Sequence, residues 1–139
     1  MSVFIDTAVI MYAAGREHEM REPCRRILKA ITTQQVEGVT SAEVIQEIFH
    51  RFTSLGDRDT GARMATAALD VFNPVLAITD ATMRQMPDLM LEHHRLSARD
   101  LVHVATCRAA GIDAIVSPDR GFDEVTGLGR IEPLTRPFG

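Results

Sequence analysis

Four acidic residues stand out because each lies beside apolar residues that are typical of a protein core. Asp6 and Asp119 follow short apolar runs, whereas Glu47 and Asp100 lie in segments with helical spacing. Without a cluster of His or Cys ligands, carboxylates favour a hard cation such as Mg²⁺ or Mn²⁺ over Zn²⁺. Such a cation polarises a phosphoryl oxygen and activates water, which is the usual route to phosphodiester cleavage.

Three of these acids also have ordinary structural explanations. Asp6 precedes a helical segment and can cap it, as Asp often does. Asp100 completes a Ser97-x-x-Asp100 spacing that resembles a capping box and needs no metal. Asp119 follows Pro118, and this pair is common in turns. The cap and turn roles are compatible with metal binding, so both interpretations stay open.

Glu47 is harder to explain structurally because core-type residues flank it on both sides. Burying an unpaired carboxylate costs several kcal/mol, so Glu47 requires a partner. Arg51, four residues later on the same helical face, is the structural candidate for that partner. Glu43 lies four residues before Glu47 and is an alternative ligand, although Glu47 has the more apolar neighbours.

Short apolar runs alternate with amphipathic segments along the chain, which predicts an α/β fold with a mainly parallel sheet. The predicted strands are residues 2–5, 38–40, 75–78 and 114–116, with a last edge strand at Ile131. The predicted helices are residues 7–14, 17–34, 41–52, 57–72, 80–92 with a kink or an edge at Pro87, 97–110, and one turn over 119–125. In the helix over 41–52, the expected core residues are Val44, Ile45, Ile48, Phe49 and Phe52. Because the carboxyl ends of parallel strands meet at one edge, Asp6 and Asp119 are expected to lie there.

Length and composition favour one globular domain over residues 1–139, since 45% of the residues are hydrophobic and 24% are charged. Fifteen basic residues against nineteen acidic ones give a net charge of −4, which argues against a protein that simply coats nucleic acid. The surplus of negative charge equals the four candidate acids. The longest uncharged stretches, residues 7–15 and 71–79, are too short to span a membrane.

Two further features favour a cytoplasmic protein. The sequence begins without a basic region and reaches Asp6 early, so a signal peptide is not expected. Cys24 and Cys107 lack CxxC spacing and lie in helical patterns, which is typical of reduced thiols.

Four stretches, in this order and at these separations, resemble PIN-domain nucleases, specifically the VapC toxins of bacterial type II toxin–antitoxin systems. The stretches are residues 3–7 (VFIDT), 40–48 (TSAEVIQEI), 97–105 (SARDLVHVA) and 115–123 (IVSPDRGFD). The resemblance extends over nearly the whole chain. One departure is Pro118, because many members of the family carry Asn before the fourth acid.

The resemblance implies a PIN-like α/β/α sandwich and one or two Mg²⁺ or Mn²⁺ ions. The implied metal ligands are Asp6, Glu47, Asp100 and Asp119, with Thr7 and Ser117 as supporting hydroxyls and Asp123 as a less consistent further acid. It also implies a homodimeric endoribonuclease toxin that cleaves structured RNA, a tRNA or an rRNA, and is inhibited by a cognate VapB-type antitoxin. Water activated by Mg²⁺ would attack in line and leave a 3′-hydroxyl and a 5′-phosphate.

Competing interpretations differ in strength. An aspartyl-phosphate enzyme fits poorly. Its haloacid-dehalogenase-like version has a second Asp where this chain has Ala8, and a receiver domain has a Lys after a late strand, whereas the one Lys here is Lys29 in an early helix. A dinucleotide-binding domain lacks its Gly-rich turn. The serious alternative is a catalytically silent PIN-fold module that binds RNA or protein.

His103 is expected mainly to pack in the core. The basic residues Arg16, Arg21, Arg25 and Arg26 are explained equally well by RNA steering and by a solvated helix face.

Overall fold

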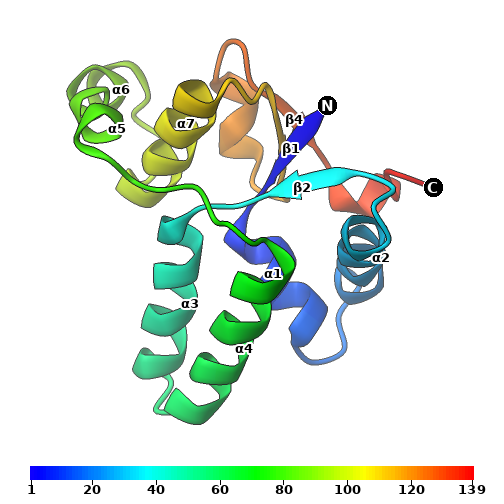
Figure 1. Cartoon of the computed structure of the whole chain (residues 1–139). Helices are drawn as coiled ribbons and strands as arrows, with labels where there is room; N and C mark the ends of the chain where they lie inside the picture. Colours follow the sequence, from blue (N-terminus) through cyan, green and yellow to red (C-terminus); the bar gives the residue numbers. More distant parts are fainter.

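A four-stranded parallel sheet with helices around it forms the centre of the computed structural model, which describes residues 1–139 (Figure 1). The strands are β1 (Ser2–Ile5), β2 (Glu37–Val39), β3 (Ala114–Val116) and β4 (Gly129–Ile131). Their order in the sheet is β2-β1-β3-β4, and every neighbouring pair is parallel. The predicted α/β class is therefore confirmed.

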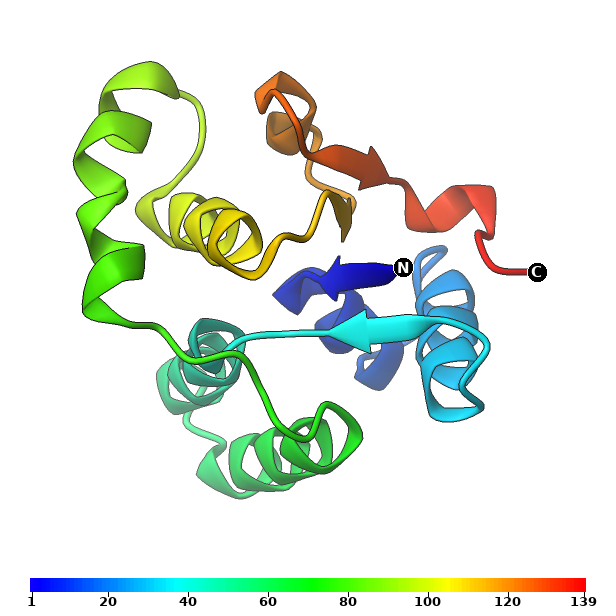
Figure 2. The same cartoon turned by 45° about the horizontal axis from the view of Figure 1, so that its top comes forward.

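The helices cover most of the remaining chain. They are α1 (Thr7–Ala14), α2 (Arg21–Thr32), α3 (Ala42–Ser54), α4 (Arg58–Val71), α5 (Asp80–Arg84), α6 (Met86–Glu92) and α7 (Ala98–Ala110), with short 3₁₀ helices η1 (Arg120–Glu124) and η2 (Pro133–Thr135). Figures 1 and 2 show α3 and α4 side by side, α5 to α7 as a second group, and the C-terminus beside α2. None of these helices has the length and apolar character that crossing a membrane requires.

Side-chain caps explain why several helices begin where they do. Ser41 accepts a hydrogen bond from the Val44 amide at the start of α3, and Ser97 accepts one from the Asp100 amide at the start of α7. These caps satisfy amides that have no partner within the helix. At its other end α7 stops at Gly111, whose φ of 70° is the left-handed conformation that glycine adopts readily.

Apolar residues from the sheet and its helices form one core cluster of 31 buried residues. Phe4 and Ile5 of β1 are fully buried, as are Leu101 of α7 and Ile115 of β3. The elements that carry Asp6 and Asp100 are thus fixed by well-packed apolar neighbours, which limits how far these acids can move.

Two predicted elements differ in extent from those observed. Residues 75–78 do not form a strand, and only a single bridge links Leu76 to Ser41. The reason is that β2 ends at Val39 and the chain turns into α3 at Ala42, so little extended backbone is left to pair with. The predicted helix over 17–34 begins only at Arg21, because the Met20 amide donates to the imidazole of His18 instead of continuing a helix.

The buried face of α3 is narrower than predicted. Val44, Ile45 and Ile48 are buried as expected, but Phe49 is 45% exposed and Phe52 is half-buried. In a helix of 3.6 residues per turn, Phe49 lies about 100° around the axis from Ile48 and turns away from the core.

Candidate active site at the carboxyl ends of the strands

Three parallel strands end at the same edge of the sheet and bring chemically active residues together there. Asp6 follows β1, and its amide donates to the carbonyl of Val116 at the end of β3, at 3.1 Å. Thr40, which follows β2, donates through its hydroxyl to the carbonyl of Ile5, at 2.9 Å. These bonds tie the three strand ends to one another, so the side chains that follow them have fixed relative positions.

Asp6 is held at this edge by hydrogen bonds to both carboxylate oxygens. Its Oδ1 accepts from the Thr7 amide at 2.8 Å, and its Oδ2 accepts from the Ser117 hydroxyl at 2.5 Å. The Ser117 oxygen in turn accepts from the Asp119 amide, at 3.0 Å. Asp6 therefore caps α1, as its structural interpretation predicted, and is also linked through Ser117 to the turn that carries Asp119.

A Ser117→Ala substitution is expected to lower the free energy of unfolding by about 2 kcal/mol, because Asp6 and the Asp119 amide both lose a buried partner. Chemical denaturation at pH 7 measures this change. A Thr106→Ala variant is the matched control, since its buried hydroxyl bonds only a carbonyl within α7. A Ser117→Ala protein as stable as the wild type would contradict the linking role of Ser117.

Asp119 and Asp123 differ in what their carboxylates contact. Asp119 Oδ1 accepts from the Gly121 amide at 2.8 Å and so caps η1. Asp123 is paired with Arg130, at 2.9 Å between Oδ1 and Nε, and Arg130 also donates to the Ser117 carbonyl at 3.0 Å. Asp123 is thus connected to the strand edge only through the guanidinium of Arg130.

His103 is the partner of Glu47, and the expected pairing with Arg51 does not occur. The Nε2 atom of His103 lies 3.0 Å from Glu47 Oε1 and 3.6 Å from Asp6 Oδ1. The imidazole is fully buried and packs against the ring of Phe4, with centroids 5.3 Å apart. The packing role that the sequence suggested for His103 is therefore only part of its environment, because the ring also lies between two carboxylates.

The sequence does contain a signal for His103. It lies three residues after Asp100, on the same face of one helix. What the spacing cannot indicate is that Glu47, from another helix, also points to this place. The proximity of Glu47 and His103 depends on how α3 packs against α7, which is a tertiary contact.

Burial and neighbouring negative charge raise the pKa values of Asp100 and Asp6 at this edge of the sheet. The pKa of Asp100 is raised to about 6, first by burial and then by the charges of Asp6 and Asp119, despite a hydrogen bond from Ser97. Burial also raises the pKa of Asp6, although His103 and Ser117 oppose the shift. Burial and neighbouring negative charge thus disfavour ionisation of Asp6 and Asp100, a cost that a cation beside them would relieve.

The Glu47–His103 pair carries opposite shifts. Burial alone would raise the pKa of Glu47, but contact with His103 outweighs it and the net shift is downward. For His103, burial alone would lower the pKa, yet Glu47 and Asp6 together raise it. Both shifts favour the ionised forms of the pair, a carboxylate on Glu47 and an imidazolium on His103.

The donor set fits a divalent cation. Ligand atoms of Asp6, Asp100 and His103 lie within 4.8 Å of one another. Several buried polar atoms in the same place also lack a hydrogen-bond partner. They are Thr7 Oγ1 and His103 Nδ1, together with Glu47 Oε1 and His103 Nε2, whose 3.0 Å ion-pair contact does not have hydrogen-bond geometry. Buried polar groups are normally satisfied, so orphaned atoms beside clustered carboxylates are compatible with a site that accepts an ion and its water.

Glu43 has a different environment from Glu47. Its pKa is raised by partial burial and by the charge of Glu47, but no ion pair joins it to His103. Glu47 contacts the buried imidazole of His103 directly, and His103 also contacts Asp6. Glu47 is therefore the acid of α3 that is linked to Asp6.

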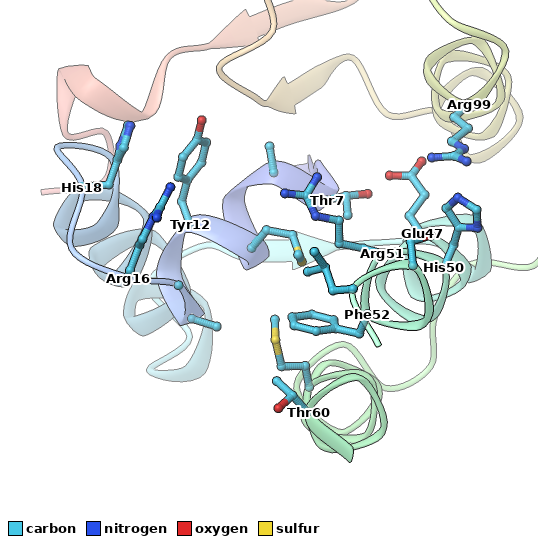
Figure 3. Close-up of a pocket in the computed structure, with 17 residues that line it drawn as sticks. Thr7, Tyr12, Arg16, His18, Glu47, His50, Arg51, Phe52, Thr60 and Arg99 are labelled. Carbon is cyan, nitrogen blue, oxygen red and sulfur yellow. The ribbon is translucent and has the colours of Figure 1, made fainter. Parts of the chain in front are cut away.

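A groove of about 1150 Å³ opens beside Glu47 and runs between α1, α3 and the start of α4. Figure 3 shows Glu47 and Arg99 on one side of it, and Tyr12, Arg16 and His18 on the other. The acidic group therefore adjoins a concave surface that can hold a larger molecule.

Comparison with known proteins matches these features to one family. The family model described as "PIN domain" matches residues 3–128. The chain is 32% identical over 129 residues to "VapC ribonuclease Mb1869c" of Mycobacterium bovis, covering 93% of this chain and 98% of that protein. It is 38% identical over 122 residues to "Ribonuclease VapC23" of Mycobacterium tuberculosis, covering 84% and 92% respectively.

A solved structure supports the fold. The crystal structure of VapBC2 from Rickettsia felis, bound to a DNA fragment from their promoter, superposes with a TM-score of 0.73. It covers 95% of this chain and 98% of that chain at 12% identity, so the likeness concerns the fold alone. Together with the matched family model and the VapC relatives, these observations show that this chain belongs to the PIN-domain family.

Proposed function

We propose that the protein is a metal-dependent endoribonuclease of the VapC type. The observation that carries the proposal is the convergence of Asp6, Asp100 and Asp119 with the Glu47–His103 pair at the carboxyl ends of the strands. The names of the relatives, VapC ribonuclease and ribonuclease VapC23, support the same activity. Nothing else in the chain gathers so many ionisable groups around two buried ones, Asp6 and His103, beside a large groove.

The metal ligands in this proposal are Asp6, Glu47, Asp100 and Asp119. The carboxylate donors favour Mg²⁺, with Mn²⁺ as a substitute, because both prefer oxygen ligands. When bound, such a cation would polarise the scissile phosphoryl group and activate water for in-line attack. Its positive charge would also relieve the repulsion that raises the pKa of Asp100.

The chain's own residues have separate tasks. Ser117 fixes Asp6 and Asp119 relative to each other through its two hydrogen bonds. His103 separates Asp6 from Glu47. Asp123 supports the site indirectly, since its partner Arg130 holds the Ser117 carbonyl. The substrate phosphate is held in a position that these fixed carboxylates define, which is how positioning lowers an activation barrier.

The substrate in this proposal is a structured RNA, a tRNA or an rRNA, and the inhibitor is a VapB-type antitoxin. The ribonuclease names of the relatives support RNA as the substrate, the VapBC2 structure supports the antitoxin, and the choice of a tRNA or an rRNA rests on the family resemblance. We also propose a homodimer, as the family resemblance implies, and a single domain, which the one continuous core supports. The unpaired, buried thiols of Cys24 and Cys107 favour a cytoplasmic location.

The test is cleavage of total cellular RNA by purified protein without antitoxin. With Mg²⁺ or Mn²⁺ we expect cutting at one or a few sites, with 5′-phosphate and 3′-hydroxyl ends, and in EDTA we expect none. End mapping by sequencing identifies the target. Cutting that persists in EDTA would contradict metal dependence.

The alternative, a catalytically silent binding module, predicts a different result. In that case folded protein binds RNA or a protein partner but cuts no RNA with any divalent cation. The presence of all four acids favours the enzyme, because a binding module gains nothing from carboxylates that repel one another and the RNA backbone.

A further inference from the structure

The groove beside Glu47 carries more positive charge than the rest of the molecule. Its basic lining residues are Arg16, His18, His50, Arg51 and Arg99, and Glu47 is its one acidic lining residue. The whole chain has a net charge of −4, so this lining differs in sign from the average of the protein. A concave surface lined with basic side chains attracts a phosphate backbone.

Two aromatic rings in contact with each other lie in the groove on the side away from Glu47 (Figure 3). The rings of Tyr12 and His18 are 4.9 Å apart between centroids, with 30° between their planes. Tyr12 is half-buried on α1, and the imidazole of His18 accepts a hydrogen bond from the Met20 amide at 3.1 Å. The pair is therefore held in place before any ligand binds.

Arg16 lies near this pair, and Arg51 lies between it and Glu47 (Figure 3). Basic side chains alternating with a flat aromatic surface are the usual means of holding single-stranded nucleic acid. An acidic peptide would use the charges but has no need of the aromatic pair. A duplex would use the charges as well, but its base faces are already covered by neighbouring bases.

We propose that this groove binds an unpaired RNA segment next to the cleaved bond, with one base stacked on the Tyr12–His18 pair. The inference rests on the proposed ribonuclease function and specifies which part of the RNA the enzyme recognises. Thr7 and Tyr12 are on the same helix, about 7.5 Å apart along its axis at 1.5 Å per residue. The stacked base therefore belongs to a nucleotide close to the cleaved phosphate, so the cleavage site lies in a loop or a single-stranded region.

Tyr12 provides a direct measurement, because it is the one tyrosine of the chain and there is no tryptophan. Its fluorescence therefore reports on the groove alone. In EDTA, which prevents cutting, a short oligouridylate is expected to quench this fluorescence on binding. An abasic ribose-phosphate oligomer of the same length is expected to bind more weakly and without quenching.

Variants separate stacking from charge. With a labelled oligouridylate, Tyr12→Ala is expected to raise the Kd about tenfold, whereas Tyr12→Phe keeps the ring and the affinity. His18→Asn, which removes the ring but keeps an acceptor for the Met20 amide, is expected to weaken binding as well. Arg16→Gln is expected to weaken binding and its salt dependence, and Arg108→Gln, exposed and outside the groove, serves as its control.

Two results would overturn the inference. The first is equal binding of the abasic oligomer and oligouridylate with unchanged Tyr12 fluorescence, and the second is oligoglutamate binding as tightly as oligouridylate. Cleavage of cellular RNA, measured separately, distinguishes this failure from failure of the proposed function. Cutting without quenching overturns only the stacking subsite, whereas quenching without cutting supports the groove and leaves the protein a binding module.

Discussion

An Asp100→Asn substitution is expected to reduce RNA cleavage on the order of 10³-fold while leaving the protein folded. The amide keeps the shape of the side chain and the backbone cap with Ser97, but it removes one negative charge from the group that includes Asp6 and Asp119. Cleavage of the mapped target RNA in Mg²⁺, under single-turnover conditions, measures the loss.

The same substitution is expected to stabilise the metal-free protein at pH 7. The pKa of Asp100 in the folded protein is about 6, above its ordinary value of 3.8. A raised pKa contributes stability that is full below pH 3.8 and is lost as the pH rises through 6, since the folded state must then hold an unfavourable carboxylate. Asn avoids that cost, so the Tm in EDTA should rise by roughly 3–6 °C.

The pH dependence and the metal dependence give independent checks. The difference in Tm between Asp100→Asn and the wild type should disappear below about pH 4, where Asp100 is protonated in both states. Saturating Mn²⁺ should raise the Tm of the wild type and have much less effect on the variant. Asp113→Asn removes an exposed acid outside the group that includes Asp6 and Asp100. It should change neither the Tm in EDTA nor the rise in Tm that Mn²⁺ produces.

An active Asp100→Asn enzyme would contradict the proposed role of this carboxylate. A lower Tm in EDTA would show that Asp100 is a structural residue, whose loss the fold cannot tolerate. Because RNA cleavage is expected to fall while the Tm in EDTA rises, general damage to the protein cannot imitate the result.

Asp6 and Asp119 were predictable as a pair because parallel strands present their carboxyl ends at one edge of a sheet. The strands themselves were recognisable from short apolar runs, and the caps at Ser41 and Ser97 from local sequence. These features depend on nearest neighbours and on a general rule of topology. The sequence therefore contained enough information to bring β1 and β3 together.

The contacts of Glu47 and Asp123 were not predictable in the same way. Arg51 is four residues from Glu47, yet it lines the groove, and Glu47 contacts His103 from a distant helix. Asp123 is paired with Arg130 for a similar reason, since β4 brings Arg130 back beside η1. Local spacing indicates which partners are within reach, but the packing of elements decides which contact forms.

Replacing His103 tests whether a buried cation holds the acids apart. In the metal-free protein, His103→Leu leaves the buried Asp6 and the partly buried Glu47 without the imidazole between them. Removing one member of a buried charged group typically costs about 3 kcal/mol or more. The Tm in EDTA should therefore fall by roughly 10 °C, measured by circular dichroism.

The pH dependence of this loss has a defined sign. The pKa of His103 is raised in the folded protein, so its stabilising charge is fully present below 6.5 and is lost as the pH rises through the raised value. The difference between wild type and His103→Leu should thus be largest near pH 6 and shrink in alkaline solution. His103→Gln, which keeps a donor but carries no charge, should fall between the two.

Mn²⁺ distinguishes charge from packing in these variants. If His103 acts through its charge, saturating Mn²⁺ should restore most of the stability of His103→Leu, because the ion supplies positive charge to the same carboxylates. A loss that Mn²⁺ leaves unchanged would mean that the imidazole acts through its contact with Phe4 alone. A His103→Leu protein as stable as the wild type in EDTA would show that Asp6 and Glu47 do not require the imidazole. Restoration by Mn²⁺ would mean that His103 and a bound ion supply positive charge to the same acids, the first in EDTA and the second when the metal is present.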